Sequence, residues 1–145
     1  MKEVTIYTDG ACAGNPGTGG WAAVLEYRGN VKEIWGGPVE ETTNIRMEMT
    51  AVLEALKILR EPCNIKLHTD LQLISDAFNK RWIQSWCNNG WRTSKGEAVK
   101  NSDLWVEIVK VSAKHKVTVV KVKGHSGDPM NERCDELAKK AASGA

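Results

Sequence analysis

The chain has 145 residues, of which 41% are apolar and 26% charged, and its formal net charge is +2. This balance excludes a protein that binds polyanions through overall basicity, so any such affinity must come from a local patch. No apolar run approaches the ~18 residues of a membrane span, and the first residues form no signal-peptide core, so we expect a cytoplasmic protein. The length fits one domain over residues 1–145 that buries roughly 70% of its unfolded surface.

The four cysteines are widely scattered, at Cys12, Cys63, Cys87 and Cys134, and they form no C-x-x-C pair. This spacing argues against a zinc site, whose ligands usually come in such close pairs. A disulfide framework is typical of smaller secreted domains that lack a sizeable core. We therefore expect free thiols.

In chain order, the pattern of apolar residues predicts three strands first, and alternating helices and strands afterwards. The expected strands are residues 3–8, 21–27, 31–37, 64–69 and 116–122. The expected helices are residues 43–60, 71–79, 81–91, 101–113 and 129–142. Asp128 is the predicted cap of the last helix, which begins at Pro129. A glycine-rich turn joins the first two strands, and Gly36-Gly37-Pro38 ends the third.

This order predicts an α/β fold with a five-stranded mixed sheet flanked by helices. Three strands with short connections form an antiparallel meander. The two later strands are each reached through a helix, so they should lie parallel to the first strand. The carboxyl ends of the first, fourth and fifth strands then share one edge of the sheet.

Four acidic residues from distant segments fall at that edge. Asp9 and Asp70 each follow a strand that ends there. Glu48 lies in the first turn or two of a helix that starts there, and Asp135 lies in the second turn of the last helix. Because open α/β sheets bind ligands beyond the carboxyl ends of their strands, we expect these four carboxylates to form a site.

Carboxylates gathered in this way require a cation or protonation. Two of them ~4 Å apart repel by about 4 kcal/mol at an effective dielectric near ~20. Oxygen ligands with no His or Cys among them favour Mg²⁺ or Mn²⁺ over zinc. Two such ions can activate a water and stabilise a leaving oxygen during phosphoryl transfer. Phosphodiester hydrolysis is therefore the expected chemistry.

Each acid also has a structural interpretation when it is considered alone. Asp70 could cap the helix that follows it, and Asp135 could pair with Lys139 one turn later. Glu48 could be a solvated helix charge, and Asp9 could be a turn residue. The convergence of all four on one edge favours a functional site.

Six stretches of the chain match the pattern of a known family: YTDGACAGNPGTGGW, ETTNIRMEMTAVLEAL, HTDLQLI, WIQSWCNNGWRT, NSDLWVEI and VKGHSGDPMNERCDELA. In this order and over essentially its whole length, the chain resembles the type 1 ribonucleases H. The resemblance implies a ribonuclease H-like fold and an endonuclease that hydrolyses the RNA strand of RNA–DNA hybrids with two Mg²⁺ ions, leaving 5′-phosphate and 3′-hydroxyl ends. It places Asp9, Glu48, Asp70 and Asp135 on the family's metal-binding catalytic carboxylates.

By the same resemblance, His125 falls on the family's mobile loop histidine, which assists proton movement or product release. Histidine also suits this role chemically, because its ordinary pKa lies close to neutrality. His125 stands in a loop flanked by Gly124 and Gly127. We interpret His68 and His115 as structural or solvated.

The resemblance further implies that polar side chains grip the hybrid backbone, and the matching residues are Asn15, Thr43, Asn44 and Gln72. Glycines around Asn15 would let the main chain approach nucleic acid closely. Thr43 and Asn44 could alternatively cap the helix that follows, and the two roles can coexist. Such contacts suit a hybrid, because the 2′-hydroxyl of RNA is read through a wide, shallow minor groove.

Trp82, Trp86 and Trp91 lie where the family has a protruding basic handle. Trp82 would contact the DNA strand, whereas we interpret Trp86 and Trp91 as residues that pack short helices together. Relatives with a strong handle carry a lysine cluster between the last two tryptophans, and this chain has Cys87-Asn88-Asn89-Gly90 instead. This departure predicts a weaker grip on the hybrid.

Two further departures, Ile45 in place of an amide and Leu71 in place of a serine, leave the metal ligands unchanged. Two rival functions are a catalytically weak hybrid-binding module and another polynucleotidyl transferase or resolvase on the same fold. The four acids argue against the first, and the His125 loop with the tryptophan handle argues against the second. We expect a monomer whose partner is an RNA–DNA hybrid and which does not bind membranes.

Overall fold

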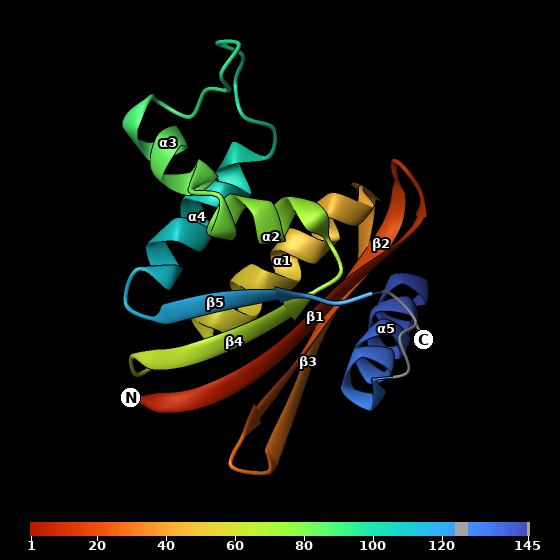
Figure 1. Ribbon diagram of the computed structural model, residues 1–145. Helices are drawn as coiled ribbons and strands as arrows, with labels where there is room; N and C mark the ends of the chain where they lie inside the picture. Colours follow the sequence, from red (N-terminus) through yellow and green to blue (C-terminus); the bar gives the residue numbers. More distant parts are fainter. Residues whose placement is uncertain (124–127, 145) are drawn as a thin grey trace.

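The computed structural model describes residues 1–123 and 128–144 and contains one mixed sheet with strand order β3-β2-β1-β4-β5 (Figure 1). The strands are β1 (Lys2–Gly14), β2 (Gly17–Tyr27), β3 (Asn30–Thr42), β4 (Cys63–Thr69) and β5 (Lys116–Lys121). The helices are α1 (Asn44–Lys57), α2 (Gln72–Asn79), α3 (Trp82–Asn88), α4 (Ser102–Ser112) and α5 (Pro129–Ser143). β1, β2 and β3 pair antiparallel, and β4 pairs parallel with both β1 and β5. The predicted mixed sheet is confirmed.

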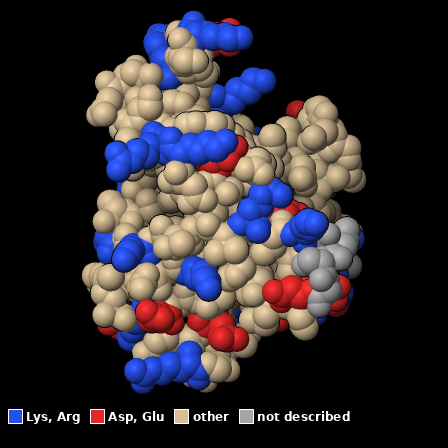
Figure 2. Space-filling model, viewed as in Figure 1, with Lys and Arg blue, Asp and Glu red and all other residues tan. Residues whose placement is uncertain are grey.

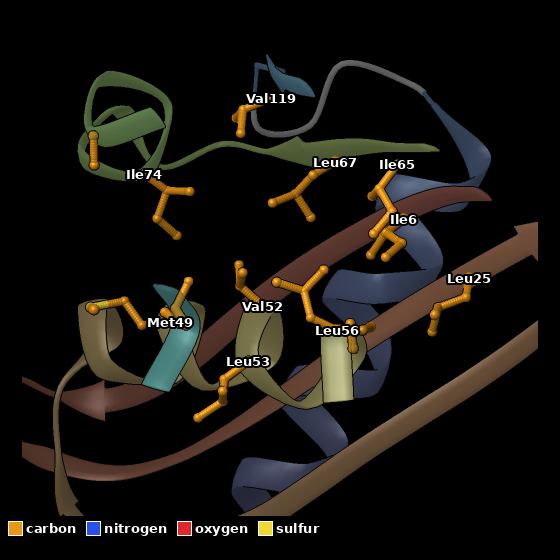
Figure 3. Packing of buried hydrophobic residues seen from close by; sticks show 14 of the residues in the cluster. Ile6, Leu25, Met49, Val52, Leu53, Leu56, Ile65, Leu67, Ile74 and Val119 are labelled. Carbon is orange, nitrogen blue, oxygen red and sulfur yellow. The ribbon is translucent and has the colours of Figure 1, made fainter. Parts of the chain in front are cut away.

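The sheet is covered on both faces, as the alternating side chains of β2 show. Ala23 and Leu25 belong to the main core, which α1 fills with apolar side chains (Figure 3). Ala22 and Val24 point to the opposite face and pack against α5. Because successive side chains of a strand point to opposite faces, one strand contributes to both layers.

α5 lies very close to the sheet because small residues form the contact. A Cβ atom placed on Gly20 of β2 would collide with the backbone of Ala141 and Ala142. Any larger residue at this position would push α5 away from β2. The absence of a side chain therefore sets the distance between this helix and the sheet.

The predicted glycine-rich turn and the predicted end of the third strand are wrong. β1 and β2 continue through the glycines, and only Asn15 and Pro16 separate them. β3 runs past Pro38 to Thr42, because Gly17 of β2 is still paired with Thr42 at its far end. Proline is tolerated there since β3 is an edge strand.

The remaining elements agree with the predicted ones to within a few residues. α1 ends at Lys57 rather than at residue 60, and α3 ends at Asn88 rather than at residue 91. The four cysteines are free, as expected. Within residues 1–123 and 128–144, no helix combines the length and the apolar character that crossing a membrane requires.

Candidate active site

Three of the four predicted carboxylates meet at one edge of the sheet. Asp9 lies on β1 just beyond the last residue that pairs with β4, and Asp70 follows the end of β4 directly. Glu48 lies in the second turn of α1 and reaches the same place. One carboxylate oxygen from each residue lies within 4.8 Å of the others.

Asp135 approaches this group from α5, on the opposite face of the sheet. Its carboxylate is close enough to Asp9 to raise the pKa of that residue. Its Oδ2 atom also lies 2.9 Å from Nζ of Lys139, one helical turn further along. Asp135 therefore both lies beside Asp9 in the carboxylate cluster and pairs with Lys139, so the two interpretations coexist.

The backbone N–H of Gly10 joins two of the acids. It donates hydrogen bonds to Oδ1 of Asp9 and to Oε1 of Glu48, each 2.9 Å long. Only glycine permits this approach, because a Cβ atom on Gly10 would lie 2.6 Å from the backbone nitrogen of Glu48. This role of Gly10 was not predicted from the sequence. The only signal was a glycine directly after an acid near the end of a strand.

Burial makes the negative charges of the site costly. Glu48 is 1% exposed, and its pKa is raised well above the ordinary value, first by burial and then by the neighbouring Asp9. Burial, opposed by the close approach of Glu48 and reinforced by Asp70 and Asp135, raises the pKa of Asp9 to about 6. Oε2 of Glu48 is buried and has no hydrogen-bond partner among the described residues. A buried, unpartnered oxygen between acids fits a site that takes up a cation.

The sequence that builds this site matches a known protein family. The family model for RNase H matches residues 1–143. The chain belongs to the ribonuclease H family. It is 53% identical over 141 residues to Ribonuclease H of Moorella thermoacetica, an alignment that covers 97% of this chain and 92% of the relative.

Solved structures of the ribonuclease H family have the same fold. LC9-RNase H1, described as a type 1 RNase H with the type 2 active-site motif, has a TM-score of 0.87 and 31% identity, covering 99% of this chain and 74% of that one. LC11-RNase H1, solved in complex with an RNA/DNA hybrid, has a TM-score of 0.74 over 97% of both chains at 22% identity, which establishes likeness of fold only. The predicted family, fold and enzyme class are confirmed.

In this ribonuclease H fold, Asp70 does not cap α2. The helix begins at Gln72, and Leu71 occupies the capping position without a side-chain hydrogen bond. The Leu71 N–H instead donates to Oγ1 of Thr69 at 3.2 Å. The capping interpretation of Asp70 was therefore wrong. Gln72, a predicted substrate contact, donates from Nε2 to Oδ1 of Asp76 at 2.8 Å.

Two predicted substrate contacts fix the start of α1. Thr43 caps the helix by accepting the Arg46 N–H at Oγ1, 3.2 Å away. Asn15, in the turn between β1 and β2, accepts the Asn44 N–H at Oδ1, 3.0 Å away. The capping interpretation of Thr43 is confirmed. The second of these bonds joins the tip of the β1–β2 hairpin to the helix that carries Glu48.

The tryptophans of α3 and its neighbouring segments form a packed cluster. The ring of Trp86 lies 6.1 Å from that of Trp82, 6.0 Å from that of Trp91 and 5.4 Å from that of the buried Trp105. The packing interpretation of Trp86 and Trp91 is confirmed. Lys and Arg side chains gather at the tip of the loop between α3 and α4, which protrudes from the molecule (Figure 2).

The three histidines have different positions. His115 accepts the Cys63 N–H at Nδ1, 3.0 Å away, so it has a structural role. His68 stacks on Tyr7. His125, the predicted loop histidine, lies outside the described residues.

Proposed function

We propose that this chain hydrolyses the RNA strand of RNA–DNA hybrids and leaves 5′-phosphate and 3′-hydroxyl ends. The observation that carries the proposal is the meeting of Asp9, Glu48 and Asp70 at one sheet edge, with their oxygens within 4.8 Å of one another. These residues come from three distant segments of a chain in the ribonuclease H family. The relative at 53% identity bears the name Ribonuclease H, which supports the same reaction here.

The donor set suits a hard divalent cation. Asp9, Glu48 and Asp70 offer only carboxylate oxygens, and the buried Oε2 of Glu48 has no partner among the described residues. Such ligands favour Mg²⁺, for which Mn²⁺ can substitute, over zinc. We infer that these three carboxylates and Asp135 hold two Mg²⁺ ions. When bound, such a pair of ions activates a water and stabilises the leaving oxygen of the phosphodiester.

The protein's own contribution to this chemistry is a fixed arrangement of oxygens. The Gly10 N–H holds one oxygen of Asp9 and one of Glu48, each at 2.9 Å, and so restrains the rotation of both carboxylates. A preset arrangement lowers the cost of reorganisation during the reaction. We assign His125 to proton movement or product release, as the family resemblance implies.

On the substrate side, we assign backbone contacts with the hybrid to Asn15, Thr43, Asn44 and Gln72, and a contact with the DNA strand to Trp82. The hydrogen bond between Asn15 and the Asn44 N–H places two of these residues side by side at the start of the helix that carries Glu48. The basic loop between α3 and α4 supplies positive charge further out. We propose a single domain over residues 1–145 that acts as a monomer.

The test is a cleavage assay with three labelled duplexes: RNA–DNA hybrid, double-stranded RNA and double-stranded DNA, each with Mg²⁺ and with a chelator. The matched control is Asp70→Asn, because Asp70 is exposed and caps no helix, so its replacement leaves the fold intact. We expect cleavage of the hybrid alone, with Mg²⁺, by the wild type and not by the variant. Hybrid binding without cleavage would favour the rival binding module and overturn the proposal.

A further inference from the structure

A hydrogen bond joins β1 to the beginning of α5, outside the carboxylate cluster. The hydroxyl of Tyr7 donates to Oδ2 of Asp128 at 3.0 Å, although the two residues are 121 positions apart in the chain. The other oxygen of Asp128, Oδ1, accepts the Met130 N–H at 3.0 Å and so caps α5. One carboxylate thus starts the helix and ties it to the central strand.

The ring of Tyr7 is held in place by its neighbour on β4. Tyr7 and His68 are cross-strand partners, and their rings stack with centroids 4.3 Å apart and an interplanar angle of 12°. Stacking against β4 restricts the rotation of the Tyr7 side chain. The hydroxyl therefore presents a fixed donor to Asp128.

Tyr7 and Asp128 each lie on the same side of their element as a carboxylate of the site. Tyr7 and Asp9 are two residues apart on β1, so their side chains leave the same face of the sheet. Asp128 and Asp135 are seven positions apart, close to two helical turns, so they lie on the same side of α5. The pair Tyr7–Asp128 therefore runs beside the pair Asp9–Asp135, between the same two elements.

The two ends of α5 are secured differently. Toward its end, the helix is pressed against Gly20 by the backbone of Ala141 and Ala142. A rigid helix held only there could still tilt about that contact, and tilting would move Asp135 relative to Asp9. Nearer the start, Cys134 Sγ lies 3.5 Å from the Tyr7 carbonyl and 3.2 Å from the Ala22 carbonyl, which are weak contacts, and Arg133 pairs with Glu33 of β3 at 2.6 Å. The Tyr7–Asp128 bond adds a tie from the capping residue of the helix to β1, the strand that carries Asp9.

We propose that Tyr7 is a positioning residue, whose hydroxyl holds the start of α5 against β1 and thereby fixes Asp135 relative to Asp9. The inference rests on the proposed function. A misplacement of about 1 Å can lower a rate by up to ~10²-fold without weakening substrate binding. Loss of the Tyr7 hydroxyl should therefore lower kcat and leave KM unchanged.

Three variants separate the Tyr7–Asp128 hydrogen bond from the capping of α5 by Asp128. Tyr7→Phe keeps the ring and its stack on His68 and removes only the donor. Asp128→Ser keeps a capping oxygen for the Met130 N–H but is too short to reach Tyr7. Asp128→Asn can keep both contacts, because its Oδ1 can accept the Met130 N–H while its Nδ2 donates to the Tyr7 hydroxyl oxygen, and it serves as the conservative rescue. Tyr27→Phe, which removes a hydroxyl at the far end of the same sheet, is the matched control.

We expect Tyr7→Phe and Asp128→Ser each to lower kcat on the hybrid by roughly 3- to 30-fold, with KM changed less than about twofold. The double variant should be no slower than the slower single variant, because both remove the same bond. Asp128→Asn and Tyr27→Phe should keep wild-type kcat. Wild-type kcat in Tyr7→Phe, a rise in KM alone, or additive losses in the double variant would each overturn the proposal.

A second readout does not depend on catalysis. Amide hydrogen exchange in the first turns of α5, residues 130–135, should be faster in Tyr7→Phe and Asp128→Ser than in the wild type, and unchanged in Asp128→Asn. Unchanged exchange in Tyr7→Phe would show that the bond does not hold the helix. A wild type that does not cleave the hybrid would refute the proposed function instead. The exchange measurement would still show whether the Tyr7–Asp128 hydrogen bond holds the start of α5.

Discussion

Glu48 accepts the Gly10 N–H at one carboxylate oxygen, 2.9 Å away, while its other oxygen is buried without a partner in the described part of the chain. The first oxygen is fixed by the backbone of β1. The second is oriented but unsatisfied, which is costly for a side chain that is 1% exposed. A bound cation would satisfy it, so this pair of residues links the packing of α1 on β1 to the proposed chemistry.

The first prediction concerns the carboxylates. Asp9→Asn, Glu48→Gln and Asp70→Asn should each reduce cleavage of the hybrid by about 10²-fold or more, because each removes a proposed metal ligand. Hybrid affinity, measured without turnover in the presence of a chelator, should stay within a few-fold of wild type. Turnover close to wild type in any one variant would remove that residue from the proposed ligand set.

The second prediction is a pH dependence of stability. The folded-state pKa of Asp9, raised to about 6 from the ordinary 3.8, means that the folded chain binds this proton more tightly than the unfolded chain does. The resulting stabilisation is fully present below pH 3.8 and is lost as the pH rises through about 6. As the pH rises between these two values, the titration of Asp9 should lower the unfolding free energy of the metal-free protein by about 1–3 kcal/mol.

Denaturant titrations of the wild type and of Asp9→Asn, in chelator at several pH values, measure this contribution. The variant cannot titrate at residue 9, so its stability should fall less over the same range. Mg²⁺ displaces protons from carboxylates, so it should stabilise the wild type more at pH 7 than at pH 5. Parallel pH profiles of the two proteins would contradict the assignment of the raised pKa to Asp9.

The third prediction concerns Gly10. Gly10→Ala should destabilise the protein by about 3 kcal/mol, because the added methyl group meets the backbone of Glu48 at 2.6 Å and of Met47 at 2.8 Å. Cleavage should fall with it, since the hydrogen bonds from this N–H would be displaced. Gly29→Asn is the control: position 29 has open space around it, and asparagine tolerates its positive φ. Equal unfolding free energies for both variants would refute the steric argument.

The fourth prediction uses the lysine-poor segment between Trp86 and Trp91, which is the end of α3 and the loop that follows it. Replacing Asn88 and Asn89 by lysine should tighten hybrid binding at low salt, up to about tenfold per new phosphate contact at ~1 kcal/mol or slightly more each. The gain should fade as salt rises and appear in KM rather than in kcat. Salt titrations of affinity for both proteins test this. An unchanged salt slope would mean that the loop does not meet nucleic acid.

The sequence was informative where local patterns determine structure. Asp128 before Pro129 predicted the start of α5, and the three-to-four spacing of Met49, Val52 and Leu56 predicted the helix on the core face. The meander and the parallel strands followed from the lengths of the connections. The shared sheet edge of Asp9 and Asp70 followed from that topology alone.

Other features depend on contacts that local patterns do not encode. The glycines between Asp9 and Trp21 were interpreted as a turn, yet the two strands stay paired there, and Gly20 accommodates the backbone of Ala141 and Ala142 in the last helix. The bond between Tyr7 and Asp128 could not be predicted, because neither residue type indicates the other as its partner. The capping interpretation of Asp70 failed because the helix begins one residue later, after Leu71.

The topology also has a consequence for folding kinetics. The β1–β2–β3 meander is local in sequence, but on its own it contains only Asp9 of the proposed ligands. Glu48, Asp70 and Asp135 join it only when α1, β4 and α5 have docked, and β4 pairs with β1 across some sixty positions, Lys2 with Cys63. Such distant pairings form late, because the entropy of closing long loops is lost before the contacts form. A refolding chain should therefore regain hybrid cleavage only at its slowest step, well after its hairpins have formed.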